Sequence, residues 1–229
     1  MLIVSEAWKN TYPGAAVGLL AMQEVANPEG HAPLDQRKEA LEEALRLRFA
    51  AHDRASLREL PVLKAYYNFY KRFDKTYHVQ LQLESLVFKG KPIPRVAALV
   101  ECMFMAELKN QLLTAMHDMD VLELPVRLEV ADGSELFTAY NGEEKILKPG
   151  DMYIADRQGV ISSVIYGPDQ RTRILPETRR ALFTVYAPPG IDERAVWEHL
   201  EDIQANVHLI TPQAKTESIA VYKANLFVD

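Results

Sequence analysis

The pattern of the sequence changes after residue 120, and this change limits the possible folds more than any other feature. Before residue 120, most apolar residues recur at helical spacing. After it come short β-like segments that are separated by Gly, Pro or Asn-Gly. These segments read LPVRLEVADG, ELFTAYNG, EKILKPG, DMYIAD, VISSVIYG and RRALFTVYAPPG. The Asn141-Gly142 pair is a strong hairpin signal. Because helices and strands are segregated, the sequence predicts an α+β fold with antiparallel pairing rather than a repeated βαβ wind.

Helix start and stop signals flank this β-rich stretch. Asp35 is a candidate N-cap, Ser56 has capping-box spacing to Glu59, and Pro61 suits the first turn of a helix. Gly90 is expected to end another helix. The expected helices cover about 35–50, 56–73, 80–88, 95–112 and 192–207, and further strands cover about 14–27 and 218–222.

An aromatic stripe crowds the helix that runs to residue 73. Its members are Tyr66, Tyr67, Phe69, Tyr70 and Phe73. Such a stripe can stack on nucleic-acid bases, but at helical spacing it is more often part of a core. We therefore expect these side chains to be buried.

Composition and charge limit the partners. The chain has 229 residues, 48% of them hydrophobic, and a formal net charge of −6. No basic, apolar leader and no run of 18 apolar residues is present, so a cytoplasmic protein without a membrane partner is expected. An acidic chain does not suit DNA or other long nucleic acids, which are bound largely through Lys and Arg, so any nucleic-acid contact should be local.

The sequence lacks the common catalytic signatures. It contains no GxSxG, HExxH, Walker or GxGxxG motif, and no cofactor or metal is expected. The segment MHDMD places His117, Asp118 and Asp120 together in an expected loop. These residues could bind a metal or position a water, but a polar turn in which Asp caps backbone N–H groups is favoured.

Two further groups are candidates for a site. Glu143 and Glu144 follow the expected hairpin turn, so alternation should point one of them inward. Ser162 and Ser163 lie in the middle of an expected strand, where small side chains let a ligand approach closely. Taken alone, solvated glutamates and ordinary strand serines are the favoured interpretation.

Four arginines cluster in the segment YGPDQRTRILPETRR. Arg171 and Arg173 alternate around Thr172 and should project from the same side, with Arg179 and Arg180 flanking the next element. Guanidinium groups suit phosphate, and they suit the surplus carboxylates of this chain equally. Residue chemistry alone favours intramolecular ion pairs over a phosphate site.

Four segments together show a resemblance that single motifs do not. They are YKRFDKTYHVQLQLESLVFKGKPIP, LVECMFMAELKNQLLTAMHDMD, GEEKILKPGDMYIAD and RTRILPETRRALFTVY. In this order the chain resembles the B3/B4 domain of the phenylalanyl-tRNA synthetase beta subunit, in its free-standing form, over about residues 10–220. The resemblance implies one domain over 1–229, with a helical N-terminal part over about 30–75. It also implies an antiparallel β-sandwich of unusual topology flanked by N- and C-terminal helices.

The resemblance also implies a function. That domain hydrolyses tyrosine wrongly esterified to the phenylalanine tRNA, so trans-acting deacylation of mischarged tRNA is expected, without aminoacylation. A non-catalytic module that binds tRNA or an amino acid is the alternative, and a protein-interaction domain is a third possibility. Glu101, Phe104 and the segment YGPDQ depart from the family pattern, which leaves the amino acid and the retention of hydrolysis open.

Site residues carried over from the resemblance form a pocket. Glu144 corresponds to the pocket glutamate, and His117 lies where the family has a pocket histidine, so these two are the candidates for ordering the catalytic water. The resemblance further implies a substrate pocket of Asp118, Ser162, Ser163 and Val164, oxyanion donors over 159–163, and contacts to the aminoacylated 3′ end of tRNA from Arg171, Arg173 and Arg179.

Overall fold

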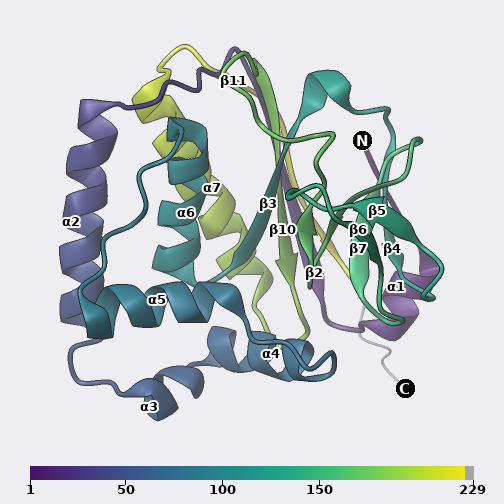
Figure 1. Ribbon diagram of the computed structural model, residues 1–229, viewed down its shortest axis with the longest axis horizontal. Helices are drawn as coiled ribbons and strands as arrows, with labels where there is room; N and C mark the ends of the chain where they lie inside the picture. Colours follow the sequence, from purple (N-terminus) through teal and green to yellow (C-terminus); the bar gives the residue numbers. More distant parts are fainter. Residues whose placement is uncertain (225–229) are drawn as a thin grey trace.

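Two β-sheets lie face to face, and most helices stack on the outer face of one of them (Figure 1). The computed structural model of the protein describes residues 1–224. The first sheet is antiparallel throughout, and its strands in spatial order are β11 (Lys215–Lys223), β2 (Ala16–Gln23), β10 (Arg180–Ala187) and β3 (Leu113–Asp118). Its two central strands are apolar and buried along almost their whole length, as expected of strands covered on both faces.

The second sheet comes mainly from the β-rich middle of the chain. Its strands in spatial order are β1 (Leu2–Val4), β4 (Val126–Val130), β7 (Met152–Ala155), β8 (Val160–Ser163) and β9 (Gly167–Pro168). A separate hairpin joins β5 (Leu136–Thr138) to β6 (Glu144–Ile146), and Gly142 in its turn has a φ of 84°. The hairpin expected at Asn141-Gly142 is therefore confirmed.

The helices form one layer and a few isolated turns. They are α1 (Glu6–Thr11), α2 (Ala32–Arg48), α3 (Arg54–Arg58), α4 (Pro61–Lys71), α5 (His78–Lys89), α6 (Ala98–Asn110), the 3-10 turn η1 (Met119–Val121) and α7 (Glu193–Ile210). Helix α6 lies among α2, α5 and α7, which explains why it is apolar nearly all round (Figure 1). None of the helices within residues 1–224 is long and apolar enough to cross a bilayer.

The α+β class is confirmed, but the pairing is not purely antiparallel. Strands β1 and β4 pair in parallel, with Leu2 opposite Val126. Parallel neighbours need a long connection between them, and here that connection contains β2, β3 and the helices α1–α6. No local pattern near residue 2 could reveal a partner more than a hundred residues away. The division into one domain with a helical part over about 30–75 stays a prediction.

Two helix starts differ from the expected ones. Helix α2 begins at Ala32 with a proline in its first turn, so Asp35 is not the N-cap and pairs instead with Lys38 at 3.1 Å. Asp53 caps α3 and Ser56 is its third residue, which means that the reciprocal capping box lies three residues earlier than expected. Gly90 ends α5 in the left-handed conformation, as expected.

The aromatic stripe of α4 is part of the core. Tyr66, Phe69, Tyr70 and Phe73 are almost fully buried, and Tyr66 stacks on Tyr77 with ring centroids 4.1 Å apart. Tyr67 departs from the expectation, because it is only partly buried and Arg58 lies over its ring. The hydroxyl of Tyr66 accepts the N–H of Leu113 at 2.8 Å and donates to the carbonyl of Tyr186. It thereby bridges β3 and β10 at the end of their pairing where Leu113 lies opposite Tyr186.

Candidate functional site

Glu144 is exposed on β6, in the small hairpin. Its neighbour Glu143 is exposed too and pairs with Lys145 at 2.5 Å. The expectation that alternation would turn one of these glutamates inward is wrong, because Glu143 precedes β6 and Glu144 lies on the exposed face of the hairpin. The inward position belongs to Lys145, which pairs with the buried Phe137. Leu136 and Ile146, which face each other across the hairpin, are also more than half exposed.

His117 is enclosed within the protein and belongs to β3 rather than to a loop. Its Nδ1 lies 2.7 Å from the hydroxyl of Thr172, and its Nε2 has no hydrogen-bond partner within the part of the chain that the structure describes. Burial, aided by the nearby charge of Arg171, lowers the pKa of His117 to about 3. The imidazole is therefore neutral at physiological pH and acts on its surroundings through Thr172.

Asp118 ends the same strand and caps the turn that follows. One of its oxygens accepts the N–H of Asp120 at 2.9 Å, and the other accepts the hydroxyl of Thr178 at 2.5 Å. The expected capping role is confirmed. Among residues 1–224, no group of three or more His, Cys, Asp or Glu side chains is arranged to hold a metal ion.

Ser162 and Ser163 are both buried, on opposite faces of β8. Ser162 shares a hydrogen bond with the hydroxyl of Tyr186, and Ser163 donates to the carboxyl of Asp151. The carbonyl of Val164 accepts the hydroxyl of Tyr70 at 2.7 Å. Each of the three residues thus holds β8 or its end to another element.

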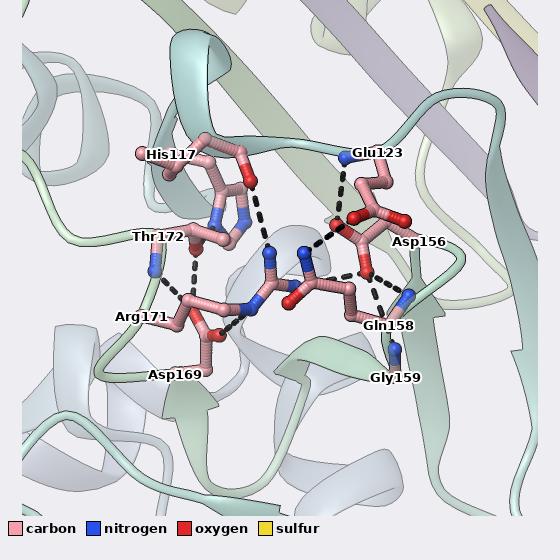
Figure 2. A network of polar contacts seen from close by, with 9 residues as sticks. His117, Glu123, Asp156, Gln158, Gly159, Asp169, Arg171 and Thr172 are labelled. Atoms are coloured by element: carbon pink, nitrogen blue, oxygen red, sulfur yellow. Dashed lines mark hydrogen bonds and ion pairs between the residues drawn. The ribbon is translucent and has the colours of Figure 1, made fainter.

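Arg171 is the centre of a polar network that crosses several loops (Figure 2). Its guanidinium donates to the carboxylate of Asp156 at 2.9 Å and to the carbonyl of Val121 at 3.0 Å, and lies 3.7 Å from Asp169. The intramolecular ion pairs favoured from residue chemistry are confirmed for Arg171. Asp156 also accepts the N–H groups of Glu123, Gln158 and Gly159, so the N–H of Gly159 is not a free oxyanion donor.

Arg173 differs from Arg171 in having no charged partner. Its side chain is exposed, and it makes no hydrogen bond or ion pair with any residue in the range 1–224. Both arginines line the same hollow, as expected if they project from one side of the segment. Arg179 lies elsewhere, donating to the carbonyls of Pro176 and Thr178, and therefore does not join this group.

The hollow that Arg171 and Arg173 share is a polar groove of about 670 Å³. It runs along β5 and the loops that follow β7 and β9. Its polar side chains are those of Thr138, Gln158, Asp169, Gln170, Arg171 and Arg173. Amides and guanidinium groups of this kind can hydrogen-bond a phosphate or a ribose without reading a sequence.

A second cavity, of about 520 Å³, opens on the other side of Arg173. We call it the apolar pocket. Its walls come from α6, the outer edge of β3 and the segment after β9, and include Val100, Met103, Phe104, Met116, Tyr140 and Ile174. Its polar lining consists of His78, Glu107, Thr114 and Arg173. Arg173 therefore lies where the apolar pocket and the polar groove meet.

Glu107 is the buried acid of the apolar pocket. It is 1% exposed, and one of its oxygens accepts the N–H of Thr114 at 2.7 Å. Burial raises the pKa of Glu107 to about 8, against that hydrogen bond. Glu107 was not among the residues predicted from the sequence, although a carboxyl in a helix that is otherwise apolar nearly all round is a signal that could have revealed it.

Thr114 links the pocket to a second buried histidine. The hydroxyl of Thr114 lies 2.7 Å from Nε2 of His199, and the amide nitrogen of Asn110 lies 3.2 Å from Nδ1 of the same ring. That amide nitrogen also donates to Asp202 at 2.8 Å, which fixes its orientation. Nδ1 of His199 is therefore the acceptor, and the ring donates its Nε2 proton to Thr114.

The predicted site residues thus divide between several places. Arg171 and Arg173 share the polar groove, whereas Glu144, His117, Asp118, Ser162, Ser163 and Val164 line neither this groove nor the apolar pocket. The roles assigned to these residues stay predictions.

Comparisons with known proteins give one structural similarity. No model of a known protein family matches the chain, and no curated protein matches it significantly in sequence. Among solved structures, the chain is similar to an N-terminal fragment of the phenylalanyl-tRNA synthetase beta-subunit from Pyrococcus horikoshii, with a TM-score of 0.47 and 12% identity. The similarity covers 95% of this chain and 54% of that one, so the chain spans about half the length of the fragment.

Proposed function

We propose that the protein is a trans-acting hydrolase that cleaves the aminoacyl ester of mischarged tRNA. The observation that carries the proposal is the pair of hollows that meet at Arg173, one apolar and one polar. An aminoacyl-tRNA end has the same two parts, because an amino-acid side chain is joined through an ester to a ribose and its phosphates. The order of four segments that resemble the B3/B4 domain supports the same substrate.

In this proposal, the apolar pocket takes the amino acid and the polar groove takes the end of the tRNA. A cavity of about 520 Å³ is within the size range of small-molecule sites. Arg173 has no carboxylate partner among residues 1–224, so its guanidinium is available for the terminal phosphate. Arg171 contributes by fixing the groove wall rather than by contacting the phosphate, since its donors are bound to Asp156 and Val121.

Hydrolysis of an ester needs an oriented water and hydrogen-bond donors for the developing oxyanion, not a protein nucleophile. We propose Glu144 and His117 as the groups that order this water. Glu144 would do so only if the hairpin β5–β6 carries it toward the bound ester. His117 would act through Thr172 and Asp169, because its ring and Thr172 are both fully enclosed. The hydroxyl of Thr172 donates to Asp169, which lines the polar groove.

A panel of labelled aminoacyl-tRNAs tests the proposal. We expect the protein to release one or a few amino acids much faster than the uncatalysed reaction. Arg173→Ala should lower kcat/KM about tenfold, the usual size of one lost charged hydrogen bond. The matched control is Arg194→Ala, which removes an exposed arginine of α7 that pairs with Glu198, and it should leave kcat/KM unchanged. Absence of ester loss across the panel would refute the hydrolase.

A binding module without hydrolysis is the second candidate. It is favoured by the enclosure of His117, Ser162 and Ser163, whose polar groups already bond within the protein. Such a module would retain aminoacyl-tRNA in an Arg173-dependent and salt-dependent way while leaving the ester intact. The same panel, read for retention as well as for ester loss, separates the two candidates.

A further inference from the structure

Strand β3 is the outer strand of its sheet, and one of its edges is therefore not paired with another strand of that sheet. Two of its N–H groups show which residues face this free edge. Thr114 donates to the carboxyl of Glu107 at 2.7 Å, and Asp118 donates to the carbonyl of Thr172 at 2.8 Å. Both acceptors lie away from β10, the neighbour of β3 on the other side.

Met116 must face the same way as Thr114 and Asp118. Successive residues of a strand direct their N–H and C=O groups to opposite sides, so every second residue shares an edge. Within residues 1–224, no side chain or loop carbonyl accepts the N–H of Met116. Met116 also lines the apolar pocket. A free backbone donor is thus available where a ligand would lie.

Glu107 lies at the same free edge of β3, where a neighbouring strand would otherwise pair. Its carboxyl accepts the N–H of Thr114 as the carbonyl of a paired strand would, and its second oxygen has no partner in the described chain. Successive N–H groups on one strand edge are about 6.7 Å apart. An ammonium group bonded to Glu107 and a carbonyl oxygen bonded to Met116 can span this distance when they belong to one α-amino acid.

We propose that the apolar pocket recognises the main chain of an aminoacyl group whose α-amino group is unblocked. Glu107 releases its proton to solvent as the ligand binds, so that its carboxylate accepts a hydrogen bond from the α-ammonium. The ester carbonyl accepts the N–H of Met116, and an apolar side chain packs against Met103 and Phe104. This inference rests on the proposed function and names its substrate class as esters of apolar α-amino acids with a free amino group. Because the N–H of Met116 also faces the carbonyl oxygen on which charge develops, it is the oxyanion donor of the reaction.

The first experiment compares each hydrolysed aminoacyl-tRNA with its N-acetylated form. Acetylation removes the charge and two of the three donors of the amino group, so we expect kcat/KM to fall at least about tenfold. Glu107→Gln should lower kcat/KM for the free-amino substrate by a similar factor while retaining the acceptor for Thr114. It should also shrink the difference between the two substrates, which a merely structural change would not do. Glu43→Gln, at an exposed position of α2, is the matched control and should preserve the full difference.

The second experiment separates this inference from the proposed function. It measures binding of an aminoacyl adenosine whose ester is replaced by an amide, which the protein cannot hydrolyse easily, alongside its N-acetylated form and an analogue with CH₂ in place of the carbonyl. We expect only the first to bind well. Tight binding of the free-amino compound without turnover of any ester would refute the hydrolase and keep the inference. Equal hydrolysis, or equal or absent binding, of free and acetylated forms would overturn the inference.

Discussion

Two buried carboxyl groups have opposite environments: Asp156, which is bonded to Arg171, and Glu107, which lines the apolar pocket. Burial raises the pKa of Asp156, but the N–H of Glu123 and the guanidinium of Arg171 outweigh it, so its pKa lies below the ordinary value. Within residues 1–224, Glu107 has one N–H donor and no cation beside it, and burial raises its pKa to about 8. A fully partnered carboxylate is part of the framework, whereas an under-partnered one can accept a ligand.

The largest effect in this comparison is expected from Asp156→Ala. The substitution leaves three N–H groups and the guanidinium of Arg171 without their acceptor, so the free energy of unfolding should fall by about 3–5 kcal/mol. Urea unfolding measures the change, with the exposed Glu29→Ala as control. A loss below about 1 kcal/mol would mean that the network is not part of the framework.

The pH dependence of stability should report on Glu107. The folded protein keeps this proton up to about pH 8, whereas the unfolded chain releases it near 4.5. The stabilisation is therefore present at acid pH and lost as the pH rises through 8. Asp151, whose pKa burial raises to about 7, acts in the same direction. Between pH 6 and pH 9, the free energy of unfolding should therefore fall by about 2 kcal/mol less in Glu107→Gln than in the wild type. Equal losses in denaturant titrations would contradict the assignment.

The two arginines of the groove should differ in their contribution to stability. Arg171→Ala removes the cation beside Asp156 and Asp169 and should cost about 1–2 kcal/mol, while Arg173→Ala should stay within about 0.5 kcal/mol. A loss of RNA binding in Arg171 variants therefore has to be separated from a loss of fold. Thermal unfolding of the two variants side by side makes the comparison, and similar melting temperatures would remove the distinction.

The smallest effect on stability is expected from Glu144→Ala. The side chain is exposed and should contribute less than about 0.5 kcal/mol to folding. Its role is tested by deacylation alone: a slower reaction with an intact fold supports Glu144 in ordering the water, and an unchanged rate excludes it from the mechanism.

Local signals in the sequence predicted most elements of the fold, because they act within a few residues. Gly90 ends its helix, the Asn141-Gly142 turn joins β5 to β6, and α7 begins where a helix was expected. The parallel pairing of Leu2 with Val126 was missed because nothing in either short segment specifies so distant a partner.

The site was less predictable than the fold, because it depends on which polar groups find internal partners. His117 and Arg171 are chemically attractive in the sequence, but Thr172 and Asp156 satisfy them within the protein. Arg173 and Glu107, by contrast, are left with fewer hydrogen-bond and ion-pair partners within residues 1–224. Whether a side chain is satisfied is decided by contacts between elements, which spacing along the chain does not report.

The hydroxyl of Tyr66 has a consequence for the order of folding. It replaces a direct hydrogen bond between Leu113 and Tyr186, so β3 and β10 cannot complete their ladder at this end until α4 has docked. The exchange rate of the Leu113 amide with solvent deuterium therefore reports the docking of α4 rather than the pairing of the two strands. In Tyr66→Phe that amide should lose its protection while the amides in the middle of β10 keep theirs.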